Sequence, residues 1–344
     1  MRGFAKIFFM LCVMFIALSC VDAVEGLDVS EGEICMSPVL SDMTETRAGG
    51  DTNPYPDGSS FGAFDFYSET EAGQPWYGTP QKYFENHEFR SDAGVCSGVD
   101  PVYWPFSGSL IFAGYSPYDA GVSAEYDVSS TTLSITGYDV DGTRNLMYFL
   151  PELSEGKHVG YGKTTSTLPI VFHHAMSCLL FNFYKGDGNK TVTLKQVKLS
   201  SVYTKANFTV SESNPSASLW SDLSEQKELV IWEKGQSLSA VPLEIEAYVI
   251  PGEAEDIVIT YHIEGDIDDK VKTIGPDEVK TWAINAKNTY NITINSMGEL
   301  LLTPTVVNNR ATHVKDANKI LIGSELTVNL GNLTSEERAR ITNL

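Results

Sequence analysis

Basic residues are scarce in this sequence of 344 residues: 24 Lys and Arg stand against 45 Asp and Glu, which gives a formal net charge of −21. A chain this acidic is repelled by phosphate backbones and by anionic lipid headgroups, so nucleic acid is excluded as a partner. Cysteine is also rare, with five widely spaced residues, and we expect neither a disulfide framework nor a zinc site. Hydrophobic residues make up 42% of the chain, which is enough to form a core and indicates a turn-rich globular protein.

Long apolar runs are absent except at residues 7–18, which follow a start that carries two basic residues. This pattern is typical of a secretory signal, and the run is too short for a membrane span. It ends in Ala17-Leu18-Ser19-Cys20, which resembles the bacterial lipobox, where small residues precede a cysteine that is lipidated. We predict that residues 1–19 are a lipoprotein signal peptide and that Cys20 carries lipid. The alternative is an ordinary signal peptide with an incidental cysteine.

The segment after the signal, residues 20–47, is predicted to be a polar leader with one short strand at 34–40. Gly, Pro and Asp are dense over residues 49–58, which is typical of an exposed linker. An isolated Arg in such a segment is an open target for a trypsin-like protease. We therefore predict that the chain is cut between Arg47 and Ala48, which would remove the leader.

The rest of the chain is predicted to be all-β. Short extended runs between turn residues indicate an aromatic-rich β domain over residues 48–165. Residues 166–296 alternate apolar and polar residues, which predicts antiparallel sheets packed as a sandwich. A change of parity within residues 192–199 predicts a β-bulge. Helical patterns are limited to two short candidates, residues 221–226 and 334–340.

A tail follows the second predicted sandwich, over residues 297–344, and it contains two more alternating segments. The first covers residues 300–306. The second has five apolar side chains on one face, which are Ile320, Ile322, Leu326, Val328 and Leu330. A strand with an apolar face must bury that face, either in its own domain or by insertion into another molecule.

Patterns that could carry chemistry are weak. Ser60 is centred in a G-x-S-x-G motif, but a serine hydrolase needs a strand before that serine and a helix after it, whereas here a linker precedes it and a strand follows. His173 and His174 point to opposite faces of a strand and cannot bind one metal together. The Asp-rich turns at 139–142 and 266–269 lack the further ligands of a calcium loop. We therefore predict no enzyme activity, no metal and no cofactor.

A cluster of aromatic residues admits two interpretations. Exposed rings could stack on sugars, whereas buried rings would form the core of a sandwich. Aromatic residues at this density in short strands usually pack against one another, which favours the core. The cluster comprises Trp76, Tyr77, Tyr103, Trp104, Phe106 and Tyr115.

Short motifs in a fixed order point to a family. In chain order they include Thr46-Arg47-Ala48, Phe61-Gly62-Ala63-Phe64, Val102-Tyr103-Trp104-Pro105, Leu110-Ile111-Phe112-Ala113-Gly114-Tyr115-Ser116-Pro117, Ile170-Val171-Phe172-His173-His174-Ala175-Met176-Ser177, Val249-Ile250-Pro251 and Tyr290-Asn291-Ile292-Thr293-Ile294. With the lipobox ahead of them, the sequence resembles the fimbrillin family of Mfa-like lipoproteins that build type V pili. The resemblance covers about residues 15–296.

The resemblance implies two transthyretin-like antiparallel β-sandwich domains in a structural subunit of a surface fimbria that serves adhesion. In such subunits a protease that cuts after Arg or Lys removes the leader, and a strand of the next subunit fills the vacated groove. The implied partners are other pilus subunits, that trypsin-like maturation protease, the outer membrane through lipid on Cys20, and a host glycan or protein. Two alternatives stay open: the anchor or tip subunit of a pilus, and a surface lipoprotein that binds glycans.

Export gives the first testable prediction. Cys20→Ala should leave an unlipidated precursor that does not reach the cell surface, because the thiol of Cys20 is the group that accepts the lipid. Metabolic labelling with a fatty acid and surface proteolysis measure both effects. Normal surface display of the variant, with no label on the wild type, would refute the lipobox.

Overall fold

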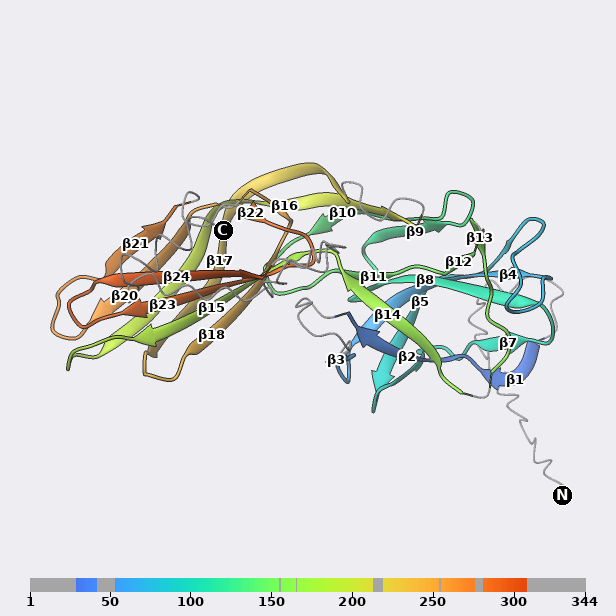
Figure 1. Cartoon of the computed structure of the whole chain (residues 1–344), viewed down its shortest axis with the longest axis horizontal. Helices are drawn as coiled ribbons and strands as arrows, with labels where there is room; N and C mark the ends of the chain where they lie inside the picture. Colours follow the sequence, from blue (N-terminus) through green and yellow to red (C-terminus); the bar gives the residue numbers. More distant parts are fainter. Residues whose placement is uncertain are drawn as a thin grey trace, which may run out of the picture.

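Strands make up all the regular structure in the part of the chain that the computed structural model describes, which is residues 29–41, 53–154, 156–164, 166–212, 219–253, 255–275 and 281–307. The all-β fold predicted from the sequence is confirmed. Two β bodies lie end to end in an elongated molecule, with the N-terminal body at the right of Figure 1. Within the described ranges, no helix has the length and apolar character needed to cross a membrane.

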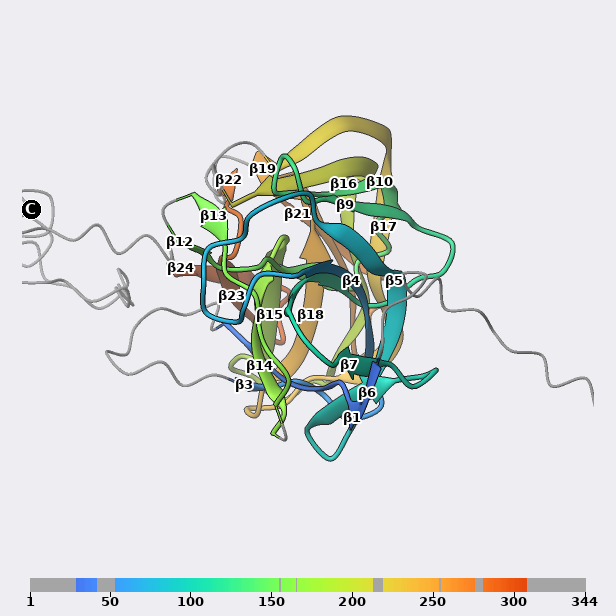
Figure 2. The ribbon, with the colours of Figure 1, turned by 90° about the vertical axis from the view of Figure 1, so that its right-hand side faces the viewer.

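The largest sheet closes on itself. A ring of seven strands runs β2, β6, β5, β4, β8, β11 and β14, with β3 attached to β2, and the pairing of β14 with β2 completes it. The strands are β2 (Cys35–Leu40), β3 (Asn53–Pro54), β4 (Ser60–Ser68), β5 (Gln81–Asp92), β6 (Val95–Gly98), β8 (Ser109–Ser116), β11 (Met147–Phe149) and β14 (Leu168–His174). Figure 2 views this body along the long axis of the molecule.

Strands β4 and β8 at the centre of the N-terminal body are buried on both faces. Phe61, Ala63 and Tyr67 of β4 belong to the core inside the closed sheet, whereas Phe64 and Phe66 belong to a second core on its outer side. This arrangement explains why the sequence is almost continuously apolar here and does not alternate.

The second core is covered by a six-stranded sheet that runs through both bodies. Its order is β21-β20-β16-β10-β9, and β17 pairs with β16. The strands are β9 (Ser123–Asp127), β10 (Thr132–Asp139), β16 (Val192–Ser211), β17 (Trp220–Ser237), β20 (Ile257–Ile263) and β21 (Lys270–Ile274). Strand β16 supplies Val192 and Leu199 to the C-terminal core and Phe208 and Val210 to the second core. The domain limits 48–165 and 166–296 stay a prediction, and β16 is shared between the two bodies.

The C-terminal body packs a four-stranded sheet, ordered β18-β15-β23-β24, against one end of the shared sheet. Its strands are β15 (Ser177–Lys185), β18 (Leu243–Val249), β23 (Lys287–Ile294) and β24 (Leu300–Val307). Strand β24 pairs with β23 along its whole length, so the first alternating segment of the tail folds back on its own body. Three short pairs complete the described strands: β1 (Val29–Glu33) with β7 (Tyr103–Pro105), β12 (Leu153–Ser154) with β13 (Lys157–His158), and β19 (Gly252–Glu253) with β22 (Thr281–Trp282).

Two local predictions have opposite outcomes. The predicted bulge is present, because the pairing of β16 shifts register between Leu194 and Gln196. The helix predicted at residues 221–226 is wrong, since this segment belongs to β17 and pairs with β16. Its polar residues suit the exposed edge of a sheet, and Asp222 and Glu225 adopt positive φ where the pairing is irregular. The other helix candidate, residues 334–340, lies outside the described residues.

Candidate functional site

The predicted leader forms part of the closed sheet. Strand β2 lies between β6 and β14, parallel to β14 and antiparallel to β6. Met36 is opposite Leu168 on one side and Cys96 on the other, and Leu40 is opposite Phe172. Figure 1 shows β2, in blue, alongside β14, in light green. We call the space that β2 fills between β6 and β14 the leader slot.

Hydrogen bonds fix both ends of the leader in this slot. The backbone amide of Ile34 donates to the carbonyl of Val102 at 2.8 Å, and the amide of Ser41 donates to the carbonyl of Phe172 at 2.8 Å. At the same end, a ring nitrogen of His174, Nε2, lies 3.0 Å from the Ser41 carbonyl oxygen. The position of β2 in the slot is therefore fixed on both sides of the strand, at Ile34 and at Ser41.

Side chains of the leader fill the core of the closed sheet. Ile34 and Met36 are fully buried and belong to the same cluster as the rings of Phe61 and Phe172, and Leu40 packs at its margin. A fully buried aliphatic side chain contributes roughly 1.5–3 kcal/mol relative to its exposed state. Loss of the leader would leave an apolar groove where Ile34 and Met36 now lie.

Strand β14 depends on the leader for its pairing. Its residues 168–172 pair with β2, whereas its pairing with β11 is confined to His173 and His174. Removal of β2 would therefore leave the edges of both β6 and β14 without a partner. Such an edge presents free backbone donors and acceptors that another strand can bind.

The predicted cleavage site lies in the sequence between the strand that fills the slot, β2, and the next strand, β3. Arg47 and Ala48 fall within residues 42–52, outside the described residues, in the connection from β2 to β3. A cut there would leave the leader attached by non-covalent contacts alone. Cys20 and the predicted donor strand, which comprises Ile320, Ile322, Leu326, Val328 and Leu330, also lie outside the described residues.

A buried carboxyl group lies inside the same closed sheet, and the sequence analysis missed it. Asp65 of β4 has 0% exposure and sits opposite Phe112, which belongs to the aromatic core. Neither carboxyl oxygen makes a hydrogen bond of normal geometry. Burial raises the pKa of Asp65 well above its usual value, and the nearby Phe66 amide offsets only part of this effect. The signal in the sequence was a single Asp within the apolar run of residues 61–67.

Asp65 gives a prediction on pH. Because its pKa is raised in the folded state, its contribution to the free energy of unfolding is most favourable below the pKa of the unfolded chain, about 3.9, and decreases as the pH rises. Asp65→Asn should therefore melt at a higher temperature than the wild type at pH 7, and the difference should shrink towards pH 4. Thermal melts across this range measure the effect, and 1 kcal/mol corresponds to roughly 2–4 °C in a chain of this size. A difference that does not vary with pH would show that the carboxyl group has the same pKa in the folded and the unfolded protein, which would contradict the prediction.

The aromatic cluster predicted from the sequence divides between core and surface. Trp76, Trp104 and Tyr115 are buried, as the core interpretation predicts. Tyr77 and Phe106 are 68% and 70% exposed, and Tyr103 is partly exposed. The core interpretation therefore holds for the three buried residues only.

The other motifs have structural roles. Ser60 begins β4, so a strand and not a helix follows it. On β14, His173 is exposed and His174 is buried beside Asn145, on opposite faces as predicted. At the turn 139–142, the guanidinium of Arg144 bonds the carboxylates of Asp119 and Asp141. No group of three or more metal-ligating side chains occurs among the described residues.

Three cysteines lie within the described ranges, and all are free thiols: Cys96 and Cys178 are buried and Cys35 is partly exposed. Burial raises the pKa of the Cys96 thiol to about 11. These cysteines show no features of a reactive or metal-binding site.

The sequence matches a family model described as fimbrillin-like over residues 46–308. The chain belongs to the fimbrillin-like family. The match begins next to the predicted cleavage site and ends just beyond β24, so it covers both bodies and leaves out most of the leader and of the tail. None of the curated proteins matches this sequence.

Solved structures resemble this fimbrillin-like chain in fold. A Bacteroides ovatus protein assigned to cell adhesion aligns with a TM-score of 0.51 and 12% identity, over 82% of this chain and 97% of that one. A Bacteroides uniformis protein, also assigned to cell adhesion, has a TM-score of 0.49 and 17% identity, over 80% and 98% of the two chains. The tip fimbrial protein Mfa3 of Porphyromonas gingivalis has a TM-score of 0.42 and 12% identity, over 80% and 99%.

Proposed function

We propose that this fimbrillin-like chain is a structural, non-enzymatic subunit of a surface pilus, assembled by exchange of its leader for a strand of another subunit. The observation that carries the proposal is the position of β2. This strand completes a closed sheet and buries Ile34 and Met36, yet it is joined to the rest of the chain through the segment that contains Arg47. It is therefore the one part of the N-terminal core that a single cut would separate from the body.

The incoming strand would bind by β-augmentation, in which backbone hydrogen bonds supply affinity and alternate side chains fill pockets. The five alternating apolar residues of the tail, 320–330, match this requirement in spacing. A strand donated from one subunit into the next makes a head-to-tail contact that does not close on itself, so it builds a filament.

Export and attachment form the remaining part of the proposal. Lipid on Cys20 would hold the precursor at the outer membrane until a trypsin-like protease cuts after Arg47. The mature subunit would then join other subunits in a fimbria at the cell surface and serve adhesion to a host glycan or protein. A subunit that keeps its leader would instead act as the anchor or the tip. The glycan-binding alternative requires Trp76 or Trp104 at the surface, and both are buried.

Removal of the cleavage site tests the maturation step. Arg47→Ala should leave the leader attached and abolish polymerisation, because β2 would continue to occupy the leader slot. The conservative variant Arg47→Lys should be processed and assemble normally. N-terminal sequencing and unheated detergent gels measure cleavage and polymer. Filaments built from Arg47→Ala subunits that retain residues 20–47 would refute the role of the leader as a plug.

A disulfide between the leader and its slot tests strand exchange separately from cleavage. Cys35 lies directly opposite Ser97 in the antiparallel pair of β2 and β6, and both residues are partly exposed. Cα atoms of such pairs are roughly 4.5–5.5 Å apart, within the range of a disulfide. Oxidised Ser97→Cys should therefore be cut after Arg47 but fail to polymerise, and reduction should restore assembly.

The matched control is Val95→Cys, which places a cysteine on the same strand opposite Asp92 of β5 and two residues from Ser97, the residue opposite Cys35. This variant should polymerise under oxidising conditions. If oxidised Ser97→Cys carries the disulfide, confirmed by mass spectrometry, and still polymerises as well as the control, assembly does not require β2 to leave.

A further inference from the structure

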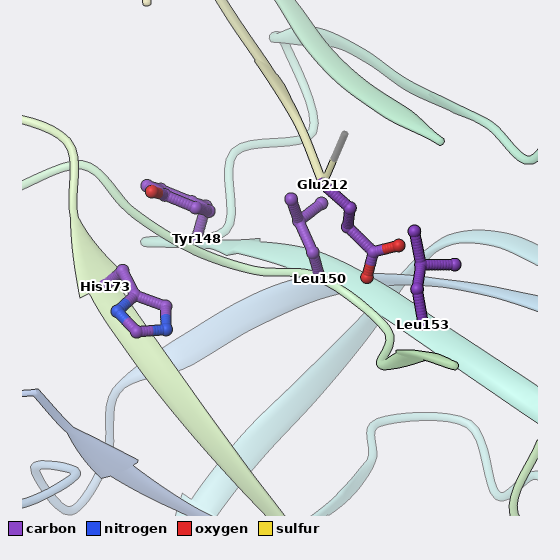
Figure 3. A pocket seen from close by; sticks show the side chains of 5 residues that line it. All are labelled: Tyr148, Leu150, Leu153, His173 and Glu212. Atoms are coloured by element: carbon purple, nitrogen blue, oxygen red, sulfur yellow. The ribbon is translucent and has the colours of Figure 1, made fainter. Parts of the chain in front are cut away.

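A pocket lies on the outer face of the closed sheet of the N-terminal body, beside the end of β14, and the proposed strand exchange does not use it. It has a volume of about 430 Å³ and is lined by Tyr148, Leu150, Leu153, His173 and Glu212. These residues come from separate segments: β11, the β11–β12 connection, β12, β14 and the residue that follows β16. Figure 3 shows Glu212 and Leu153 at one end, Tyr148 and His173 at the other, and Leu150 between them.

Glu212 at one end of the pocket is an uncompensated carboxylate. Its Oε2 atom is buried and has no hydrogen-bond partner. Burial, followed by the charge of Glu152, raises the pKa of Glu212 to about 7. The buried Tyr126 hydroxyl also lacks a partner, and burial followed by the Glu212 charge raises its pKa. The electrostatic environment therefore favours a positive charge beside Glu212.

None of the described residues that line the pocket is a lysine or arginine that could supply this positive charge. At the opposite end, the ring of Tyr148 packs against His173 at 5.7 Å and against Phe208 at 5.5 Å between centroids. Although part of His173 is exposed, desolvation of its ring lowers the pKa of His173, so the ring is neutral above pH 7 and does not compensate Glu212. Leu150 between the two ends offers an apolar surface.

We propose that this pocket binds the side chain of a lysine or arginine from a partner protein. The cationic group would pair with Glu212, with Glu152 adding to the negative potential. The methylene groups would pack on Leu150 and Leu153, as long basic side chains do when their stems cover apolar surface. The peptide backbone of the partner would lie towards the rings of Tyr148 and His173. A neutral sugar would leave the charge of Glu212 and Glu152 uncompensated, so the observations favour a cation.

Binding of small probes to the full chain tests the proposal. Calorimetry or NMR titration at pH 8 should detect Nα-acetyl-lysine methylamide and Nα-acetyl-arginine methylamide. The norleucine analogue, which has the stem without the charge, should bind at least about tenfold more weakly. At pH 5.5 the affinity for the lysine probe should fall, because Glu212 then holds a proton more often in the free protein.

Glu212→Gln should weaken lysine binding at least about tenfold and leave the melting temperature unchanged or higher. Glu125→Gln on β9 is the matched control, since it removes one exposed carboxylate of the same body that does not line the pocket, and it should bind like the wild type. Equal affinity for the lysine and norleucine probes, or equal loss in the two variants, would overturn the proposal. Saturable binding of a methyl glycoside that Glu212→Gln abolishes, without binding of the lysine probe, would make this a sugar site.

Discussion

The pairing of β2 with β14 is the contact on which the N-terminal body depends. It closes the largest sheet, and residues 168–172 of β14 pair with no other strand in the described part of the chain. The ring of Phe172 lies 5.4 Å from that of Tyr55, 5.3 Å from that of Phe61 and 5.2 Å from that of Phe149, so β14 is also held from inside. Side-chain packing keeps β14 near the core, whereas its backbone pairing comes mainly from the leader.

The interior of this closed sheet contains many side chains that stabilise the fold and one group that destabilises it. Aromatic rings and the leader's Ile34 and Met36 bury extensive apolar surface. Asp65 lies among them without a compensating charge, which lowers the stability of the closed state at neutral pH. A body opened by loss of the leader would let water approach this carboxyl group. The closed sheet is thus held by apolar contacts that outweigh the cost of burying this carboxyl group.

How far the sequence predicts the structure depends on which faces of a strand are buried. Strands β18 and β20 lie in the stretch 166–296, where alternation predicts strands, and they alternate because one face of each is buried and the other is at least partly exposed. Strands β4 and β8 are buried on both faces, so their residues show only that they are strands and not which neighbours they have. The segment 221–226 was mistaken for a helix because its polar residues sit on a sheet edge, where no apolar pattern is required.

Non-local contacts set the limit for the candidate sites. The leader strand was expected from a short apolar run, but its parallel pairing with β14 joins segments more than a hundred residues apart, which no local pattern encodes. The pocket of Glu212 brings together residues of β11, β12 and β14, of the β11–β12 connection and of the turn after β16, each ordinary in its own segment. Asp65, in contrast, could have been noticed in the sequence, because it is the one charged residue in an apolar run.

The shared strand β16 links the two bodies mechanically, because it contributes side chains to the core of each. It runs along the length of the molecule through both bodies (Figure 1), bonded on one edge to β17 and on the other to β20 and then β10. Tension applied at opposite ends would load these ladders in shear, so that many hydrogen bonds resist at once and do not open one after another. The two bodies would therefore stay together under tension. In a chain of such subunits, the contacts between subunits would yield before the contacts within one.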